Sequence, residues 1–268
     1  MSEQKYLAEF RKLFIDFLKH MHTSKEVYTA NKAIPNYAIS LYSTLKGADD
    51  DSWYLRIDPP WIVPITEDDY FERYGSYLVI GGEIQVEERK LRKYNFYVSM
   101  VRNSNSSEES KHGYLSCCEK DARTRAKSRI VRRFHFDTGK GIPEILEPRS
   151  HIQFGGICHE EQAIREYEGV DLHYCLDNKI RIPRFPYPPI DIVILLDILL
   201  RQFKTSIDRS FLEKPEWLKL VRRSEDLRLQ RYYSRINEYY QGKKTNEGKK
   251  RVKLKTLFET LCENECIF

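Results

Sequence analysis

The sequence predicts an α+β protein with a mostly antiparallel central sheet of about five to six strands, flanked by N- and C-terminal helices. Segments with strand patterns are confined to residues 37–176, and segments with helical spacing lie at both ends of the chain. Turn-forming glycine, proline and polar residues separate the strand segments. We expect an α+β core domain over residues 1–205 and a basic helical region over residues 206–268, packed on the core or extending from it.

Composition is that of a folded globular chain: of 268 residues, 41% are hydrophobic and 32% are charged. The first segment is charged and amphipathic, unlike a signal peptide. The longest apolar run, residues 190–200, contains two aspartates and is too short to span a bilayer. We therefore expect a cytoplasmic protein with no membrane partner. Its six cysteines include no CxxC pair, so we expect reduced thiols.

The N-terminal segments predict one helix and two strands. Residues 3–21 carry apolar side chains at helical spacing and predict an amphipathic helix. Residues 37–45 and 53–57 are predicted to be strands, and three prolines over residues 59–64 are expected to end the second.

Residues 77–86 and 93–102 form the clearest predicted strand pair, with the polar residues 87–92 as the turn. Gly81 and Gly82 lie inside the first of these strands, where glycine marks a bulge or a close approach of the backbone.

Residues 129–156 hold the densest group of titratable side chains. Alternation along a strand places Ile130, Arg132, Phe134 and Phe136 on one face and Val131, Arg133, His135 and Asp137 on the other. Antiparallel pairing of residues 129–137 with residues 151–154 then sets Asp137 beside His151 and His135 beside Gln153. We expect the phenylalanine face, with Ile152 and Phe154, to be core, and the polar face to be open.

The polar face is the candidate catalytic site, formed by Arg133, His135, Asp137, His151 and Gln153. Two histidines can act as general base and acid in phosphodiester cleavage, with Arg133 or Arg149 stabilising the developing negative charge. This chemistry needs neither a metal nor a cofactor.

Two alternatives remain for the same residues. The polar groups can simply bond to one another on the solvated face of an antiparallel sheet. His135, Asp137 and His151 can also form a metal site of two histidines and one carboxylate.

Two further sets of side chains have weaker patterns. Cys158, His159, His173 and Cys175 contain zinc-ligand residue types, but their spacing is not that of a zinc finger. The triplets that begin at Glu83 and Glu88 are similar to the carboxylate–lysine pairs of restriction-type nuclease cores. No P-loop, GxGxxG motif or GxSxG elbow is present.

The C-terminal part predicts a buried helix at residues 190–204, a long helix at residues 215–241 and a final amphipathic helix over residues 254–261. Between residues 214 and 255 there are 14 Lys or Arg against 5 Asp or Glu, so the positive charge is concentrated here.

The long helix carries the candidate nucleic-acid contacts Arg228, Arg231, Arg235 and Tyr232. Arginine binds phosphate and stacks on planar groups, so we expect contact with an RNA or DNA backbone. The alternative is a solvated face on which Glu225, Asp226 and Glu238 pair with these arginines.

The runs RFHFD and HIQFGG are followed by a proline-rich segment and a hydrophobic helix. Over residues 132–201 this arrangement resembles uncharacterised prokaryotic domains found among defence and toxin–antitoxin genes. The resemblance implies a role linked to nucleic acid and carries over no catalytic residue.

Two functional hypotheses follow. The first is a nucleic-acid-directed intracellular protein, a metal-independent ribonuclease-like effector that uses the histidine pair. The second is a non-catalytic interaction or ligand-binding subunit of a larger defence-type complex, which holds a partner protein or a nucleotide ligand.

Overall fold

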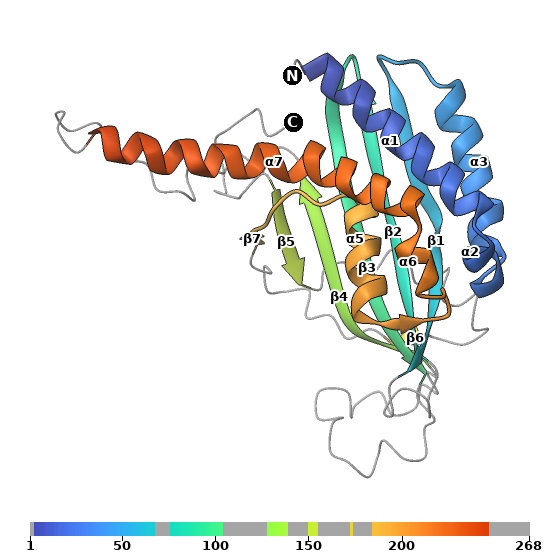
Figure 1. Cartoon of the computed structure of the whole chain (residues 1–268). Helices are drawn as coiled ribbons and strands as arrows, with labels where there is room; N and C mark the ends of the chain where they lie inside the picture. Colours follow the sequence, from blue (N-terminus) through green and yellow to red (C-terminus); the bar gives the residue numbers. More distant parts are fainter. Residues whose placement is uncertain are drawn as a thin grey trace, which may run out of the picture.

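The computed structural model describes residues 3–67, 76–103, 128–138, 150–154, 172–173 and 184–246. Its helices are α1 (Glu3–Thr23), α2 (Lys25–Ala30), α3 (Ala33–Gly47), α5 (Ile192–Gln202), α6 (Ser210–Glu213) and α7 (Pro215–Asn246). Its strands are β1 (Trp53–Glu67), β2 (Ser76–Glu87), β3 (Lys90–Asn103), β4 (Ser128–Thr138), β5 (Ser150–Phe154), β6 (Leu172–His173), β7 (Arg184–Pro186) and β8 (Lys204–Thr205). The predicted α+β class is confirmed (Figure 1).

One sheet contains all of these strands, in the order β7-β5-β4-β3-β2-β1-β8, with β6 paired to β4 outside this path. Every pairing along the path is antiparallel, and only β6 runs parallel to its neighbour. Since β6, β7 and β8 have two or three residues each, five longer strands form the body of the sheet, as predicted.

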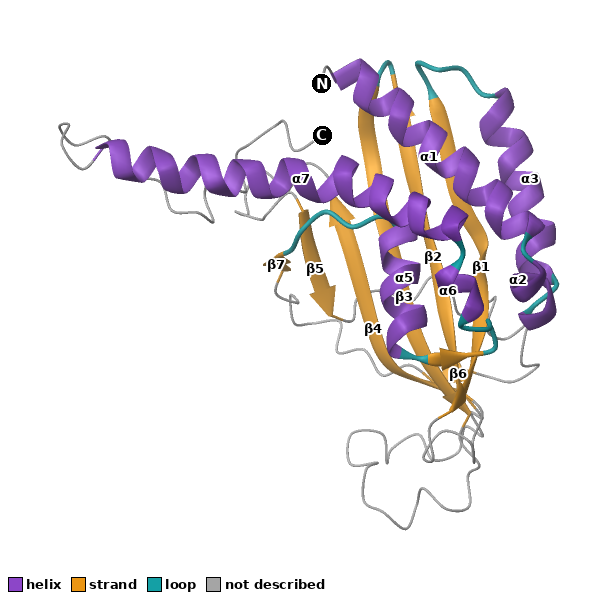
Figure 2. Cartoon of the chain, in the orientation of Figure 1, coloured by secondary structure: helices purple, strands orange, loops and turns teal. Residues whose placement is uncertain are grey.

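The helices cover one face of this sheet (Figure 2). The α1 helix confirms the predicted amphipathic segment, and its apolar side packs on the sheet through Phe10, Phe14 and Phe17. The Phe10 ring lies 6.1 Å from that of Tyr94 and 6.3 Å from that of Trp53. Fully buried aromatic rings of this kind contribute most of the apolar area that stabilises such a core.

The α5 helix confirms the predicted buried helix. Asp191 caps its N-terminus, because the Asp191 carboxylate accepts hydrogen bonds from the Val193 and Ile194 amides at 2.9 and 3.1 Å. The Arg201 side chain pairs with Asp197 one turn earlier, at 2.7 Å. No helix of the described residues is both long and apolar enough to cross a membrane.

Two N-terminal predictions are wrong. Residues 37–45 belong to α3, where Tyr37, Leu41 and Leu45 recur every four residues and face the core. The prolines do not end the next strand either, since β1 continues to Glu67 with a register shift between Ile57 and Trp61. Strand β8 pairs with β1 only at its end, so prolines along the outer edge of β1 cost few ladder hydrogen bonds.

The β2–β3 hairpin is confirmed, with a tighter turn than predicted. Glu88 and Arg89 have φ values of 51° and 60°, the left-handed pair that closes a two-residue hairpin. Gly82 has φ +149°, and a Cβ at this position would overlap the Asn95 carbonyl. A Cβ on Gly81 would overlap the Tyr97 hydroxyl, so both glycines mark a close approach.

The predicted phenylalanine face is partly correct. Phe136 packs on the helix-side core and lies 5.8 Å from the Tyr187 ring. Phe134 and Phe154 form an edge-to-face pair, but Phe154 is 48% exposed rather than buried. Ile130 lies on the opposite face from the one predicted, because a register shift at Met100 and Val101 changes the alternation along β4.

Candidate histidine–aspartate site

The predicted pairing of β4 with β5 is confirmed. Asp137 pairs with His151 and His135 pairs with Gln153, and Tyr97 of β3 lies on the other side of His135. These side chains lie on the sheet face opposite the helix-side core, because Phe134 and Phe136 alternate with them along β4.

One carboxylate oxygen lies between the two imidazoles. The Oδ2 atom of Asp137 is 3.6 Å from His135 Nδ1 and 3.7 Å from His151 Nε2. Both distances are longer than a hydrogen bond, so these contacts are chiefly electrostatic. Asp137 therefore contacts both imidazoles at nearly equal distances, although only His151 is its partner across β4 and β5.

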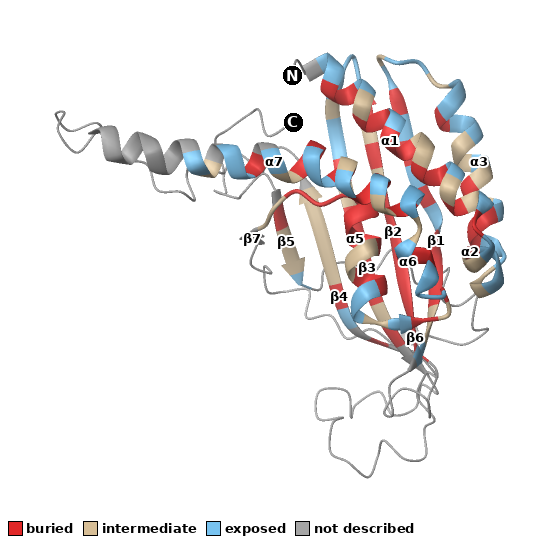
Figure 3. Cartoon of the chain, viewed as in Figure 1, coloured by how far each residue is buried: buried red, intermediate tan, exposed pale blue. Residues whose placement is uncertain are grey.

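This face is less open than predicted. The side chain of His151 is 6% exposed, that of His135 is 14% exposed and that of Asp137 is 28% exposed. A second apolar cluster, formed by Ile62, Tyr77, Val79, Val101 and Ile130, lies on the same face of the sheet. Most of β4 is of intermediate burial, as Figure 3 shows. The expected open, solvated face is therefore wrong.

The charge of Asp137 is set by its two neighbours. Burial alone raises the pKa of a carboxyl, but contacts with His135 and His151 outweigh burial and hold the pKa of Asp137 well below its usual range. The carboxylate is therefore ionised at all ordinary pH values.

An aromatic ring and a guanidinium complete the cluster. The Tyr97 ring stacks on that of His135 with centroids 5.8 Å apart. Arg133, which is 3% exposed, places its guanidinium carbon 5.2 Å from the Tyr97 centroid. Tyr97 was not predicted as a site residue. Its position opposite Gly81 in the β2–β3 pair, where glycine leaves room for a large ring, could have identified it. Arg149 lies outside the described residues.

The structure describes only part of the other predicted sites. Among the described residues, no group of three or more His, Cys, Asp or Glu side chains is arranged to hold a metal ion. The six cysteines and His159 lie outside those residues, as does the predicted final helix. The Glu83 carboxylate forms an ion pair with Lys93 and accepts a hydrogen bond from the Tyr54 hydroxyl. It therefore links β2 to β3 and to β1.

The predicted nucleic-acid face of α7 is corrected at two positions. Arg228 is 1% exposed and Tyr232 is 6% exposed, so neither side chain lies on a solvated stripe. The side chains of Arg231 and Arg235 lie outside what the structure describes. The helical spacing was right, but α7 packs against α1 and α5 along the side that carries Arg228.

Arg228 instead belongs to a buried polar cluster that the sequence did not reveal. Its Nη1 donates to the Tyr6 hydroxyl at 2.7 Å, and its guanidinium carbon lies 4.5 Å from the Tyr94 centroid. Asp191 accepts a hydrogen bond from the Ser224 hydroxyl at 2.6 Å. Burial opposes the charge on Arg228, yet Tyr6, Tyr94 and Asp191 raise its pKa further.

No protein-family model matches the chain, and neither a curated protein nor a solved structure shows significant similarity to it.

Proposed function

We propose that this protein is a nucleic-acid-directed phosphodiesterase of the metal-independent ribonuclease type, with His135 and His151 as its acid–base pair. The observation that carries the proposal is the position of Asp137 Oδ2, in contact with both imidazoles. A single carboxylate that orients two histidines supports a pair that exchanges protons with one substrate.

The two nitrogens of His135 suit it to the role of base. Its Nδ1 faces Asp137, and its Nε2 has no hydrogen-bond partner among the described residues. A proton held on Nδ1 by the carboxylate leaves Nε2, which is itself buried, with an unprotonated lone pair, the arrangement of a general base. His151, on the other side of the same oxygen, would then be the protonated partner.

The reaction on RNA balances with these groups alone. His135 takes the proton of the 2′-hydroxyl, and the 2′-oxygen forms a bond to phosphorus. The bond from phosphorus to the 5′-oxygen breaks, and the leaving oxygen takes a proton from His151. Arg133, two residues before His135 on the same side of β4, supplies positive charge as charge builds on the phosphate.

The test is cleavage of RNA and DNA oligonucleotides with and without EDTA. Cleavage of RNA that survives EDTA is expected, and His135→Ala and His151→Ala should each lower its rate by about 100-fold or more. His22→Ala is the matched control, since this histidine bonds to the Pro35 carbonyl far from the cluster and its loss should leave the rate unchanged. Full activity in both cluster variants would refute the proposal.

The second hypothesis, a non-catalytic interaction or ligand-binding subunit of a defence-type complex, has its own supporting observation. His151 and Arg133 are 6% and 3% exposed, as is typical of groups that stabilise a fold. On this hypothesis neither nucleic acid is cleaved under any condition, while the cluster variants unfold more easily than the wild type. Cleavage and unfolding measured on the same variants therefore distinguish the two functions.

A further inference from the structure

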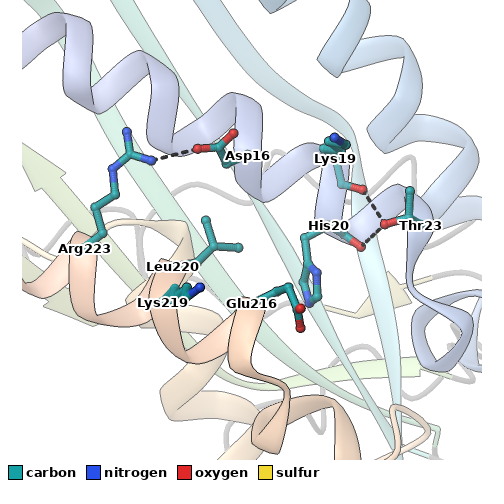
Figure 4. Close-up of a pocket in the computed structure, with 8 residues that line it drawn as sticks. All are labelled: Asp16, Lys19, His20, Thr23, Glu216, Lys219, Leu220 and Arg223. Atoms are coloured by element: carbon teal, nitrogen blue, oxygen red, sulfur yellow. Dashed lines mark hydrogen bonds and ion pairs between the residues drawn. The ribbon is translucent and has the colours of Figure 1, made fainter.

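A groove of about 480 Å³ lies between α1 and the first half of α7, on the helical layer rather than on the sheet face with the histidine pair (Figure 4). Its volume falls within the range of small-ligand sites. The residues that line it are Asp16, Lys19, His20, Thr23, Glu216, Lys219, Leu220 and Arg223.

The walls of the groove are held in place by packing and by ion pairs. Arg223 of α7 bonds to Asp16 of α1 at 2.8 Å and to Glu9 at 3.1 Å. The ring of His20 lies 5.2 Å from Phe211 and 6.1 Å from Trp217, both fully buried. A groove fixed in this way needs little rearrangement to bind a ligand.

The residues that line the groove include three cations and two carboxylates. Arg223 is neutralised by Asp16 and also pairs with Glu9 outside the groove, whereas Lys19 and Lys219 project from facing helices and form no ion pair within the described part of the chain. Glu216 contributes one negative charge against these two. Lysine is a point-charge donor that binds phosphate well.

The floor of the groove offers a polar atom and an apolar surface. His20 Nε2 is buried without a hydrogen-bond partner among the described residues, and Leu220, which also lines the groove, is buried. Burial, together with the charge of Lys214, lowers the pKa of His20 despite the opposing charges of Glu216 and Glu26, and so favours the neutral ring. A neutral imidazole nitrogen of this kind is a hydrogen-bonding group in need of a partner.

We propose that this groove binds a small molecule that carries a phosphate monoester on an apolar or planar body. The phosphate would lie between Lys19 and Lys219, and the body would lie against Leu220 and the His20 ring. A phosphate monoester has three terminal oxygens, enough for both lysines and one further donor.

The probe is adenosine 5′-monophosphate, compared with adenosine and with inorganic phosphate by isothermal titration calorimetry on the full chain. The monophosphate should bind at least about tenfold more tightly than either fragment, and its affinity should fall with added salt. Equal affinity for adenosine would refute phosphate recognition. Equal affinity for inorganic phosphate would refute a role for the body, and no binding of the monophosphate would refute the site.

Variants test the residues. Lys19→Gln and Lys219→Gln should each weaken binding of the monophosphate by about tenfold. Lys12→Gln is the matched control, since Lys12 is an exposed lysine of α1 that does not line the groove. His20→Phe keeps an aromatic ring on Trp217 and removes the nitrogen, so weaker binding by this folded variant would assign a role to that atom. Unchanged affinity in both lysine variants would overturn the proposal.

The same titration on His135→Ala separates this site from the proposed catalytic one. Binding that persists in that variant belongs to the groove, whether or not the protein cleaves nucleic acid. Binding that disappears with His135 and survives Lys219→Gln belongs to the sheet face and refutes the groove.

Discussion

Asp137 and Asp191 lie on opposite faces of the same sheet, and their pKa values are shifted in opposite directions. Asp191 is fully buried beneath the helices, and burial raises its pKa despite the Ser224 hydrogen bond and the charge of Arg228. Asp137 keeps 28% of its side chain exposed, and two imidazoles lower its pKa against the effect of burial.

The difference shows that burial alone does not decide the charge of a carboxyl group. Asp191 faces neutral donors and one arginine shared with two tyrosines, so desolvation dominates. Asp137 has two imidazoles close to one of its carboxylate oxygens, so its interactions with them outweigh the effect of burial on its pKa. The helix-side cluster therefore stabilises packing, whereas the cluster on the other face holds a carboxylate that stays ionised beside two imidazoles.

The largest expected effect comes from Arg228→Met, which tests whether the helix-side cluster depends on its cation. The change leaves Asp191 and the Tyr6 hydroxyl buried without their charged neighbour, so the free energy of unfolding should fall by about 3–5 kcal/mol. Urea denaturation measures it. Arg222→Met, an exposed position on the same helix, should change stability by less than about 0.5 kcal/mol. Equal effects of the two changes would mean that Arg228 is not part of a coupled cluster.

Asp137→Asn tests the charge on the opposite face. A lowered carboxyl pKa stabilises the fold above the usual value near pH 4, and this contribution is lost as pH falls through the lowered pKa. The wild type should lose about 2 kcal/mol across that range that the asparagine variant does not lose. Denaturation curves between about pH 5 and pH 2 measure this loss. Asp58→Asn, at an exposed ion pair, should keep the wild-type acid dependence.

The Asp191→Asn change should show the opposite sign. A raised carboxyl pKa gives stability that is present below the usual value and lost as pH rises through the raised pKa. Asparagine keeps a cap for α5 but cannot ionise, so the free energy of unfolding of the variant, relative to that of the wild type, should increase from acid to neutral pH. An Asp191→Asn pH dependence of the same sign as that of Asp137→Asn would contradict the contrast between the two faces.

Glu26→Gln sets the scale for an ion pair outside both clusters. A hydrogen bond from Lys214, at 2.5 Å, lowers the pKa of Glu26 to about 2. The substitution should lower the free energy of unfolding at pH 7 by about 0.5 kcal/mol, because partly exposed pairs are screened by water. The effect should shrink further in 1 M salt, where screening extends only about 3 Å. An effect as large as that of Asp137→Asn would remove the distinction between clustered and isolated carboxylates.

Local pattern was enough to predict the elements that hold both clusters. Alternation on either side of the turn-rich segment gave the register that pairs Asp137 with His151, and helical spacing gave α1 and α5. These features depend on neighbours within a few positions of the chain or on one antiparallel pairing. Their periodicity can be recognised from the order of apolar and polar residues in the sequence.

Tertiary packing alone decided which of those faces are covered. Helical spacing grouped Arg228 with Arg231 and Arg235, but only the docking of α7 on α1 placed Arg228 between Tyr6 and Tyr94. Strand alternation likewise placed Arg133 and His151 on one face, but it did not show that an apolar cluster lies on the same face. Periodicity states which side chains share a surface, whereas burial depends on contacts between segments far apart in the chain, which no local pattern contains.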